Sequence, residues 1–200
     1  MTKPVIAVDL DDIVLDFAPW FIAHHNSQYD TSVRYEDVFD FSNFDRVFQL
    51  PEHVMIDRLW KAFTEQHHTI PLVEHAQEAL HKLEQDFSVH AITSRCESLA
   101  HETYMRLCQL GALHKLTKVH FTNGGKMTKH PQRTREKVAV CEEIGAILLL
   151  DDLPAHLEQV ANKNIHALLM DRPWNQGFTA PGIVRTHNWH EVLAWVEKNL

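Results

Sequence analysis

The sequence lacks an apolar run long enough to cross a membrane, because no uninterrupted stretch reaches the roughly 20 residues that a spanning helix needs. No leader with an apolar stretch and a cleavage site opens the chain, so we expect no signal peptide. Cysteine is scarce: Cys96, Cys108 and Cys141 are scattered without CxxC spacing. Such an odd, sparse set is typical of reduced thiols. We therefore expect a cytoplasmic protein with no membrane partner.

Dense runs of lysine and arginine are also absent, and the formal net charge is -8 over 200 residues. An acidic protein repels the phosphate backbone of nucleic acids, so the charge argues against binding to duplex nucleic acid. A small anionic ligand would need a local attractor, such as a metal ion or helix N-termini. The sixteen histidines show no HExxH or comparable ligand spacing. We interpret them as solvated surface residues, with a structural metal site as the alternative.

Short apolar runs recur along the chain and are continuous rather than alternating, which is typical of strands buried on both faces of a parallel sheet. The predicted strands are 5–8, 89–92, 119–121, 147–150 and 165–169. The predicted helices that follow are 74–84, 98–110, 135–144, 154–162 and 190–199. For the helix at 135–144, Thr134 is the expected N-cap and Gly145 the expected C-cap. The alternation predicts an α/β fold, a Rossmann-like parallel sheet in three layers.

Residues 17–68 interrupt this alternation, because they show helical or irregular patterns and no convincing strand. We interpret them as a small helical cap inserted after the first strand, and residues 1–16 and 69–200 as the core domain. The segment is rich in aromatic residues, which either form a core of the cap or stack on a ligand. The candidates for stacking are Phe17, Trp20, Phe21, Trp60 and Phe63.

Polar side chains follow three of the predicted strands. They are Asp9, Asp11 and Asp12 after the first strand, Thr93, Ser94 and Arg95 after the second, and Asp151 and Asp152 after the fourth. A single aspartate of this kind is often only a helix N-cap. Their joint occurrence favours a site at the carboxyl edge of the sheet, where open α/β folds bind ligands. Clustered carboxylates need a cation, and Mg²⁺ suits carboxylates that face a phosphate. A carboxylate can then attack that phosphate.

The same stretches resemble the ordered motifs of the haloacid dehalogenase (HAD) superfamily. Residues 8–14 (VDLDDIV) resemble its first motif, residues 91–94 (AITS) its second and residues 149–152 (LLDD) its fourth. Residues 9–17 (DLDDIVLDF) are most similar to the 5'(3')-deoxyribonucleotidase-type branch, the C-type 5'-nucleotidases. Asp12 departs from this branch, which usually has glycine there.

The resemblance implies a role for each motif residue. Asp9 would be the nucleophile and a metal ligand, and Asp11 the acid/base, with its backbone carbonyl on the metal. Asp151 would complete the metal site, with Asp152 as a further ligand or as a residue that orients one. Thr93, with Ser94 and Arg95 beside it, would bind the substrate phosphate.

The lysine of the third motif has three candidates. Lys137, at the start of a predicted helix, is the preferred one, and Lys126 and Lys129 in the preceding loop are the alternatives. Two further residues also have two interpretations each. Arg95 either contacts substrate or pairs with Glu97 or an aspartate, and Trp174 either packs under the C-terminal loop or lies at the rim of the site.

The function that the resemblance implies is Mg²⁺-dependent hydrolysis of a phosphomonoester through an aspartyl-phosphate. Asp11 favours this reaction, because dehalogenases of the superfamily lack the second aspartate and its transport ATPases carry threonine there. Nucleoside monophosphates are the favoured substrate class, and another small phosphorylated metabolite is the alternative. A non-catalytic phosphate-binding protein of the same fold is the alternative from a different class.

Overall fold

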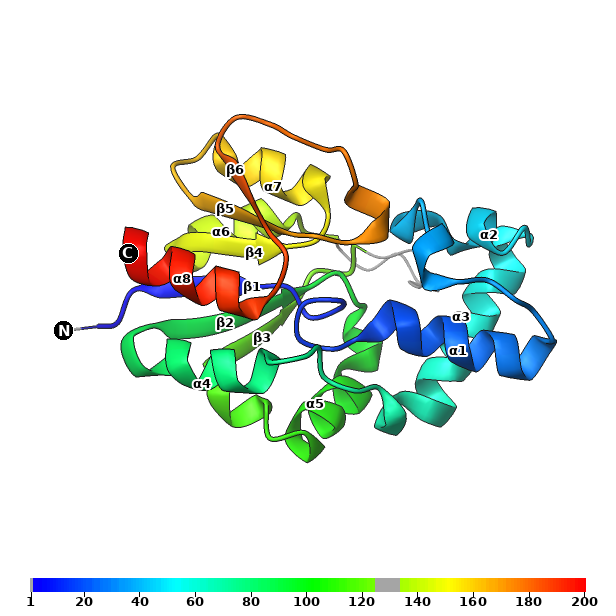
Figure 1. The fold of residues 1–200 in the computed structure, drawn as a ribbon. Helices are drawn as coiled ribbons and strands as arrows, with labels where there is room; N and C mark the ends of the chain where they lie inside the picture. Colours follow the sequence, from blue (N-terminus) through cyan, green and yellow to red (C-terminus); the bar gives the residue numbers. More distant parts are fainter. Residues whose placement is uncertain (1, 125–133) are drawn as a thin grey trace.

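A six-stranded sheet with the order β3-β2-β1-β4-β5-β6 forms the centre of the molecule, and all its strands pair in parallel (Figure 1). The computed structural model describes residues 2–124 and 134–200. The strands are β1 (Val5–Val8), β2 (Ser88–Thr93), β3 (Lys118–Phe121), β4 (Ala146–Asp151), β5 (His166–Met170) and β6 (Ile183–Thr186). The chain moves outward from β1 in both directions, so β1 marks the point where an open α/β sheet binds its ligand.

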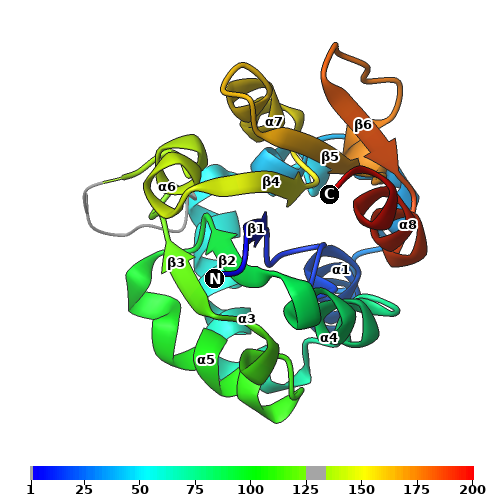
Figure 2. The same ribbon diagram turned by 90° about the vertical axis from the view of Figure 1, so that its left-hand side faces the viewer.

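Helices cover both faces of the sheet (Figure 2). They are α4 (Ala76–Asp86), α5 (Ala100–Gln109), α6 (Lys137–Ile144), α7 (Pro154–Ala161) and α8 (Trp189–Asn199). On one face, Val140 of α6 and Leu157 of α7 belong to one buried apolar cluster. On the other face, Leu80 of α4 and Val192 of α8 belong to a second cluster. The strands read as continuous apolar runs because both of their faces are buried, which confirms the predicted fold class.

The cap segment, residues 17–68, has no strand in its described backbone. It contains the helices α1 (Phe17–Tyr29), α2 (Phe44–Val47) and α3 (Glu52–Gln66), joined and followed by short 3-10 turns. Figure 1 shows these helices beyond the end of β1, on the side toward which the strands point. None of the helices among the described residues has the length and apolar character of a membrane span. The division into a core domain and a cap at these boundaries stays a prediction.

Two details of the predicted secondary structure are wrong. The prediction missed β6, an edge strand whose Val184 is exposed, so that its sequence lacks the apolar run of a buried strand. Helix α6 begins at Lys137 with Glu136 as its N-cap, not after Thr134. The Thr134 hydroxyl instead donates to the carbonyl of Asn123 at 3.3 Å, so the loop after β3 uses that side chain. Gly145 ends α6 with φ +66°, as predicted.

Not all histidines are solvated, contrary to the interpretation from the sequence. His25 of α1 is completely buried, with Nε2 2.9 Å from the Arg58 guanidinium and Nδ1 2.9 Å from the Thr31 hydroxyl. His120 of β3 is also buried and lies 3.0 Å from His90 of β2. Burial lowers the pKa of His25 and of His120 to about 4. Both side chains are therefore neutral at neutral pH.

The turn after β1 contains Asp12, whose backbone lies in the left-handed region with φ +61°. Glycine adopts this conformation at the lowest cost, which accounts for the glycine of the resembling branch. Aspartate is among the few other residues that visit it. Here its side chain also has a use, because Asp12 Oδ1 accepts a hydrogen bond from the Ala18 N–H in the first turn of α1 at 2.9 Å. The Asp12 carbonyl accepts hydrogen bonds from the Arg172 guanidinium.

Candidate active site

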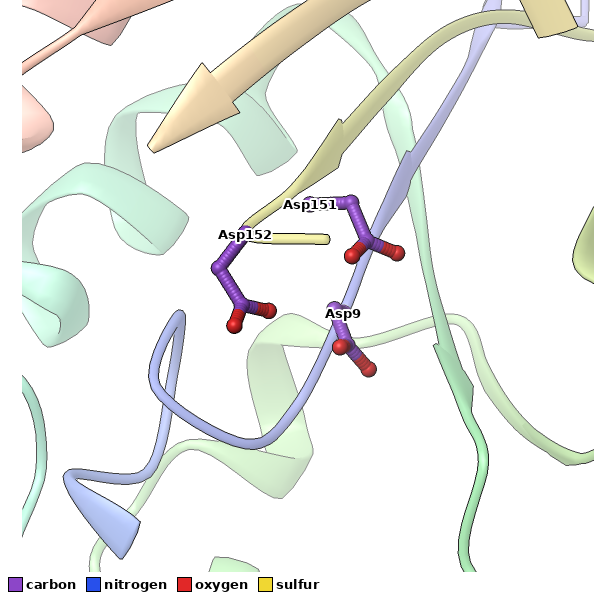
Figure 3. Close-up of side chains that lie close together, drawn as sticks. All are labelled: Asp9, Asp151 and Asp152. Carbon is purple, nitrogen blue, oxygen red and sulfur yellow. The ribbon is translucent and has the colours of Figure 1, made fainter. Parts of the chain in front are cut away.

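The first feature of the site is a group of three buried carboxylates at the carboxyl edge of the sheet, Asp9, Asp151 and Asp152 (Figure 3). Asp9 follows β1, and Asp151 and Asp152 lie at the end of the neighbouring β4. One oxygen of each carboxylate lies within 4.8 Å of the others. Buried like charges at this separation repel one another strongly unless a cation is present.

Lys137 supplies one cation to this group. Its Nζ lies 2.8 Å from Asp9 Oδ2 and 2.7 Å from Asp151 Oδ2, and the side chain is fully buried at the first residue of α6. Burial disfavours the charge, but the carboxylates of Asp151 and Asp9 outweigh it and raise the pKa of Lys137 above its usual value. Lys137 is therefore a buried, charged partner of both aspartates. The alternative candidates Lys126 and Lys129 lie outside the described residues.

One lysine does not balance the negative charge of three buried aspartates. The pKa values show which of the three carboxylates bear the uncompensated charge. Burial raises the pKa of Asp9 to about 6, although Lys137 opposes this shift. Burial also raises the pKa of Asp152 well above its usual range, and the charges of Asp151 and Asp9 add to the effect. The pKa of Asp151 is lowered, because Lys137 and His156 outweigh its burial. The group therefore has room for further positive charge.

The geometry and the donor set fit a hard divalent cation. Among the hydrogen bonds of the described residues, the buried Oδ1 of Asp152 has no partner. An unpartnered buried carboxylate oxygen is costly. Carboxylate oxygens are the ligands that Mg²⁺ prefers. Asp9, Asp151 and Asp152 can therefore hold such an ion.

Asp11 lies two residues after Asp9, but its carboxylate is paired with an arginine and is not part of this group. It accepts two hydrogen bonds from Arg95, at 2.9 Å from Nε to Oδ2 and at 2.5 Å from Nη2 to Oδ1. Arg95 also donates from Nη1 to the Thr103 hydroxyl at 3.0 Å, and its guanidinium lies 4.5 Å from the centre of the Phe63 ring. Of the two interpretations of Arg95, the structure shows the pairing with an aspartate. Any role of Asp11 in metal binding would then fall to its backbone carbonyl.

A cavity of about 340 Å³ opens beside Asp11, between the core and the cap segment. Its core wall includes Ser94, Arg95 and His156. Its cap wall is mostly apolar and includes Phe17, Phe41, Phe44, Met55, Leu59 and Phe63. The cavity thus joins a polar end at the carboxyl edge of the sheet to an aromatic end, as is common in small-molecule sites.

The structure separates the two hydroxyl residues of the second motif. Ser94 lines the cavity. Thr93 is completely buried, and its Oγ1 accepts a hydrogen bond from the Arg95 N–H at 3.2 Å. Its carbonyl accepts two hydrogen bonds from Thr122 of the loop after β3. Ser94 is therefore the one of the two that lines the cavity, and the hydrogen bonds of Thr93 hold the loop that carries it.

Only some of the aromatic residues predicted to stack on a ligand line the cavity. Phe17 and Phe63 line the cavity and stack on each other with ring centres 5.2 Å apart. The cavity lining does not include Trp20, Phe21 or Trp60. Phe21 is buried in the large apolar cluster that also contains Leu80 and Val192 of the core. Phe41 and Phe44 also line the cavity but were not among the predicted stacking residues, because the spacing of aromatic residues in a sequence does not show which ring faces a cavity.

Two further residues lie beside the carboxylates; His156 was not predicted, and Trp174 was a candidate for the rim of the site. His156 lies in the first turn of α7, and its Nδ1 is 3.0 Å from Asp151 Oδ2. Trp174 lies in the loop after β5, and its indole N–H donates to Asp152 Oδ2 at 2.7 Å. The sequence signal for His156 was its place in the first turn of the helix that Pro154 opens, soon after Asp151 and Asp152. The contact of Trp174 with Asp152 was not predicted, since 22 residues separate the two.

Comparisons with known proteins agree with this geometry. The fold is similar to that of a haloacid dehalogenase-like family hydrolase from Streptococcus pneumoniae. The TM-score is 0.67, with 12% sequence identity over 97% of this chain and 98% of that one. The HAD-hydrolase YfnB from Bacillus subtilis, solved bound to magnesium, has 14% identity over 98% and 100% of the two chains and a TM-score of 0.61. A HAD-superfamily hydrolase of subfamily IA from Geobacter sulfurreducens has 14% identity over 97% and 96% and a TM-score of 0.59. At these identities the likeness shows the fold.

The sequence itself identifies the family. A search of curated proteins found no match. A family model described as "5' nucleotidase, deoxy (Pyrimidine), cytosolic type C protein" matches residues 3–199, which is nearly the whole chain. The chain therefore belongs to the cytosolic type C 5'-nucleotidase family, and it is a HAD-type phosphatase that acts on phosphomonoesters.

Proposed function

We propose that the protein hydrolyses nucleoside monophosphates with the help of Mg²⁺, through an aspartyl-phosphate formed on Asp9. The observation that carries the proposal is the contact of Lys137 with both Asp9 and Asp151, at 2.8 and 2.7 Å, within a group of three buried carboxylates. Lys137 neutralises part of the charge that an incoming phosphate would meet. A buried carboxylate beside such a lysine is a nucleophile suited to phosphorus.

In the first step, an oxygen of Asp9 attacks the phosphorus, and the bond between phosphorus and the ester oxygen breaks. Asp11 gives its proton to the leaving alcohol. In the second step, Asp11 takes a proton from water as the water oxygen attacks phosphorus. The bond between phosphorus and the Asp9 oxygen breaks, which releases inorganic phosphate and restores the Asp9 carboxylate. Because Asp9 and Asp11 are two residues apart, one turn after β1 carries both the nucleophile and the acid/base.

Arg95 connects substrate binding to the proton that Asp11 must carry. Its guanidinium holds the Asp11 carboxylate at 2.5 and 2.9 Å and also lines the cavity. A phosphate dianion in the cavity competes for the same guanidinium, since arginine binds phosphate and carboxylate with the same paired donors. Substrate binding would loosen the contact between Arg95 and Asp11 and leave Asp11 free to exchange protons. Ser94 would add a hydroxyl donor to the phosphate.

The residues that would hold Mg²⁺ are Asp9, Asp151 and Asp152, with the backbone carbonyl of Asp11 as a fourth ligand. A bound Mg²⁺ would neutralise the carboxylates and polarise the phosphoryl oxygens. The unpartnered Oδ1 of Asp152 supports this assignment. The magnesium bound to the similarly folded YfnB also supports it.

The substrate class follows from the cavity and from the family. A volume of about 340 Å³ lies within the range of small-molecule sites. Phe17, Phe41, Phe44 and Phe63 line it, and stacking on an aromatic ring contributes roughly 1–3 kcal/mol per base. The family description names deoxy and pyrimidine 5'-nucleotidases of a cytosolic type, so we favour deoxynucleoside monophosphates and a cytosolic location.

Phosphate release from a panel of monophosphates tests the proposal. The panel contains deoxynucleotides, ribonucleotides and sugar phosphates, and each is assayed with Mg²⁺ and with EDTA, for wild type and Asp9→Asn. We expect Mg²⁺-dependent release that Asp9→Asn abolishes, with nucleotides as the best substrates. Preference for a sugar phosphate would replace the substrate class and leave the mechanism intact. No release from any ester by a folded protein that binds Mg²⁺ would favour the non-catalytic binding protein.

A further inference from the structure

Trp174 makes a direct contact with the carboxylate group of the site. Its indole N–H donates to Asp152 Oδ2 at 2.7 Å, while Asp152 is completely buried. The short turn that carries it, Pro173–Asn175, is anchored to the ends of both β4 and β5, because the Asn175 amide donates to the carbonyls of Asp152 and Met170 at 2.8 Å each. Asn175 in turn accepts from Arg185 of β6 at 2.8 Å. The indole is therefore presented from a fixed turn.

The other contacts of the same indole lie in the cap segment. The Trp174 ring packs on Phe41, with ring centres 4.7 Å apart, and meets Tyr35 edge-on at 5.9 Å. Phe41 lines the cavity, whereas the cavity lining does not include Trp174. A chain of contacts thus runs from the cavity wall through Phe41 and Trp174 to Asp152.

We propose that Trp174 is a positioning residue, which fixes Asp152 for the binding of Mg²⁺ and links it to the aromatic wall of the cavity. This inference rests on the proposed function, since it concerns the same metal site. Because the indole occupies Oδ2, the unpartnered Oδ1 of Asp152 is the oxygen left for the ion. A donor that holds a metal-binding carboxylate in one orientation typically contributes 10- to 100-fold to metal affinity.

The test is the affinity for Mg²⁺ itself, measured by titration calorimetry of the full chain without substrate. Trp174→Phe keeps an aromatic ring beside Phe41 and removes the N–H donor, so we expect Mg²⁺ to bind about 10- to 100-fold more weakly. Trp195→Phe is the matched control, because the Trp195 ring contacts His166 at the first residue of β5, at the end of that strand away from the carboxylates. We expect the control to bind Mg²⁺ as wild type does.

A second variant tests the link to the cavity wall and stays informative if Trp174→Phe does not fold. Phe41→Leu removes the ring that packs on Trp174 and leaves the N–H donor in place. Residues along such a chain of contacts change coupling by roughly 2- to 30-fold, so we expect a smaller loss of Mg²⁺ affinity. In steady-state assays both variants should need more Mg²⁺ for half-maximal rate, whereas kcat at saturating Mg²⁺ changes less.

The outcomes separate this inference from the proposed function. Wild-type affinity for Mg²⁺ in a folded Trp174→Phe protein would overturn the role of Trp174 and leave the metal site intact. Wild-type affinity in Phe41→Leu would overturn the link to the cavity wall. A wild-type protein that binds no Mg²⁺ would overturn the metal site of the proposed function, and the role of Trp174 with it.

Discussion

The carboxyl edge of the sheet and the aromatic wall of the cap segment face the same cavity but are built differently. At the edge, Asp9, Lys137 and Asp151 are buried charges within 2.8 Å of a partner, and each stands directly at the end of a strand or the start of a helix. On the wall, four phenylalanine rings from the helices α1, α2 and α3 and from the turn before α2 contact one another: Phe17, Phe41, Phe44 and Phe63.

This difference separates chemistry from selection of the substrate. A buried ionic group tolerates almost no change, because removal of one member leaves the others without a partner. An aromatic wall tolerates substitution better, because its contacts are spread over many atoms and adapt to the volume available. The edge should therefore determine whether a phosphate ester is hydrolysed, and the wall should determine which one.

The largest effect is expected at Lys137. Lys137→Met leaves Asp9 and Asp151 buried without their shared cation, so we expect a loss of about 3–5 kcal/mol in the free energy of unfolding, measured by urea denaturation in EDTA. Added Mg²⁺ should restore part of it, and kcat should fall about 10²- to 10³-fold. Lys163→Met is the control, because Lys163 is half exposed and pairs with Glu142 at the surface, where such pairs contribute at most about 1 kcal/mol. A Lys137→Met protein as stable as wild type in EDTA would contradict the ionic description of the edge.

A smaller and more selective effect is expected on the wall. Phe44→Leu replaces an aromatic ring that lines the cavity with an aliphatic side chain. We therefore expect KM for a deoxynucleoside monophosphate to rise by the equivalent of roughly 1–3 kcal/mol. KM for glycerol 2-phosphate, which has no ring to stack, should stay unchanged. Phe39→Leu is the matched control, since Phe39 is a cap phenylalanine that is 64% exposed. Equal increases in KM for both substrates would show that the wall does not select the base.

The smallest effect concerns the pH dependence of folding in the cap segment. Because burial lowers the pKa of His25 to about 4, the unfolded chain binds a proton at His25 below about pH 6.5 and the folded chain does not. Stability is therefore complete above pH 6.5 and falls as the pH drops toward 4, by at most about 1.4 kcal/mol per pH unit for this residue. Urea denaturation at pH 7.5 and pH 5 measures the slope, which His25→Asn should reduce. The exposed His187 offers the control His187→Asn, and an equal slope in His25→Asn and wild type would rule out His25 as the source.

The sequence alone predicted the strands and the site residues where a buried strand leads directly into polar residues. The strands ending at Val8, Thr93 and Asp151 are short continuous apolar runs, and residues next to each other in sequence carry the motif. Contacts between residues far apart in the sequence have no such pattern. Arg95 and Asp11 lie 84 residues apart, and Trp174 and Asp152 lie 22 apart. Either pair becomes visible only once the sheet order is known.

The remaining errors have similar causes. An edge strand such as β6 has only one neighbouring strand and an exposed Val184, so its sequence carries little of the signal of burial. Thr134 has the side chain of an N-cap, but its hydroxyl bonds to Asn123, and the helix begins three residues later. Both features thus depend on contacts with distant parts of the chain: β6 on its pairing with β5, and Thr134 on its hydrogen bond to Asn123.

Asp12 illustrates how a family position can change without a change in chemistry. The backbone there has φ +61°, and the Asp12 carboxylate holds the Ala18 N–H at the start of α1. A relative with glycine at this position gains an unstrained turn and loses that anchor. The Asp12 side chain therefore ties the turn after β1 to the first helix of the cap segment, a link between the two parts of the molecule that a glycine does not supply.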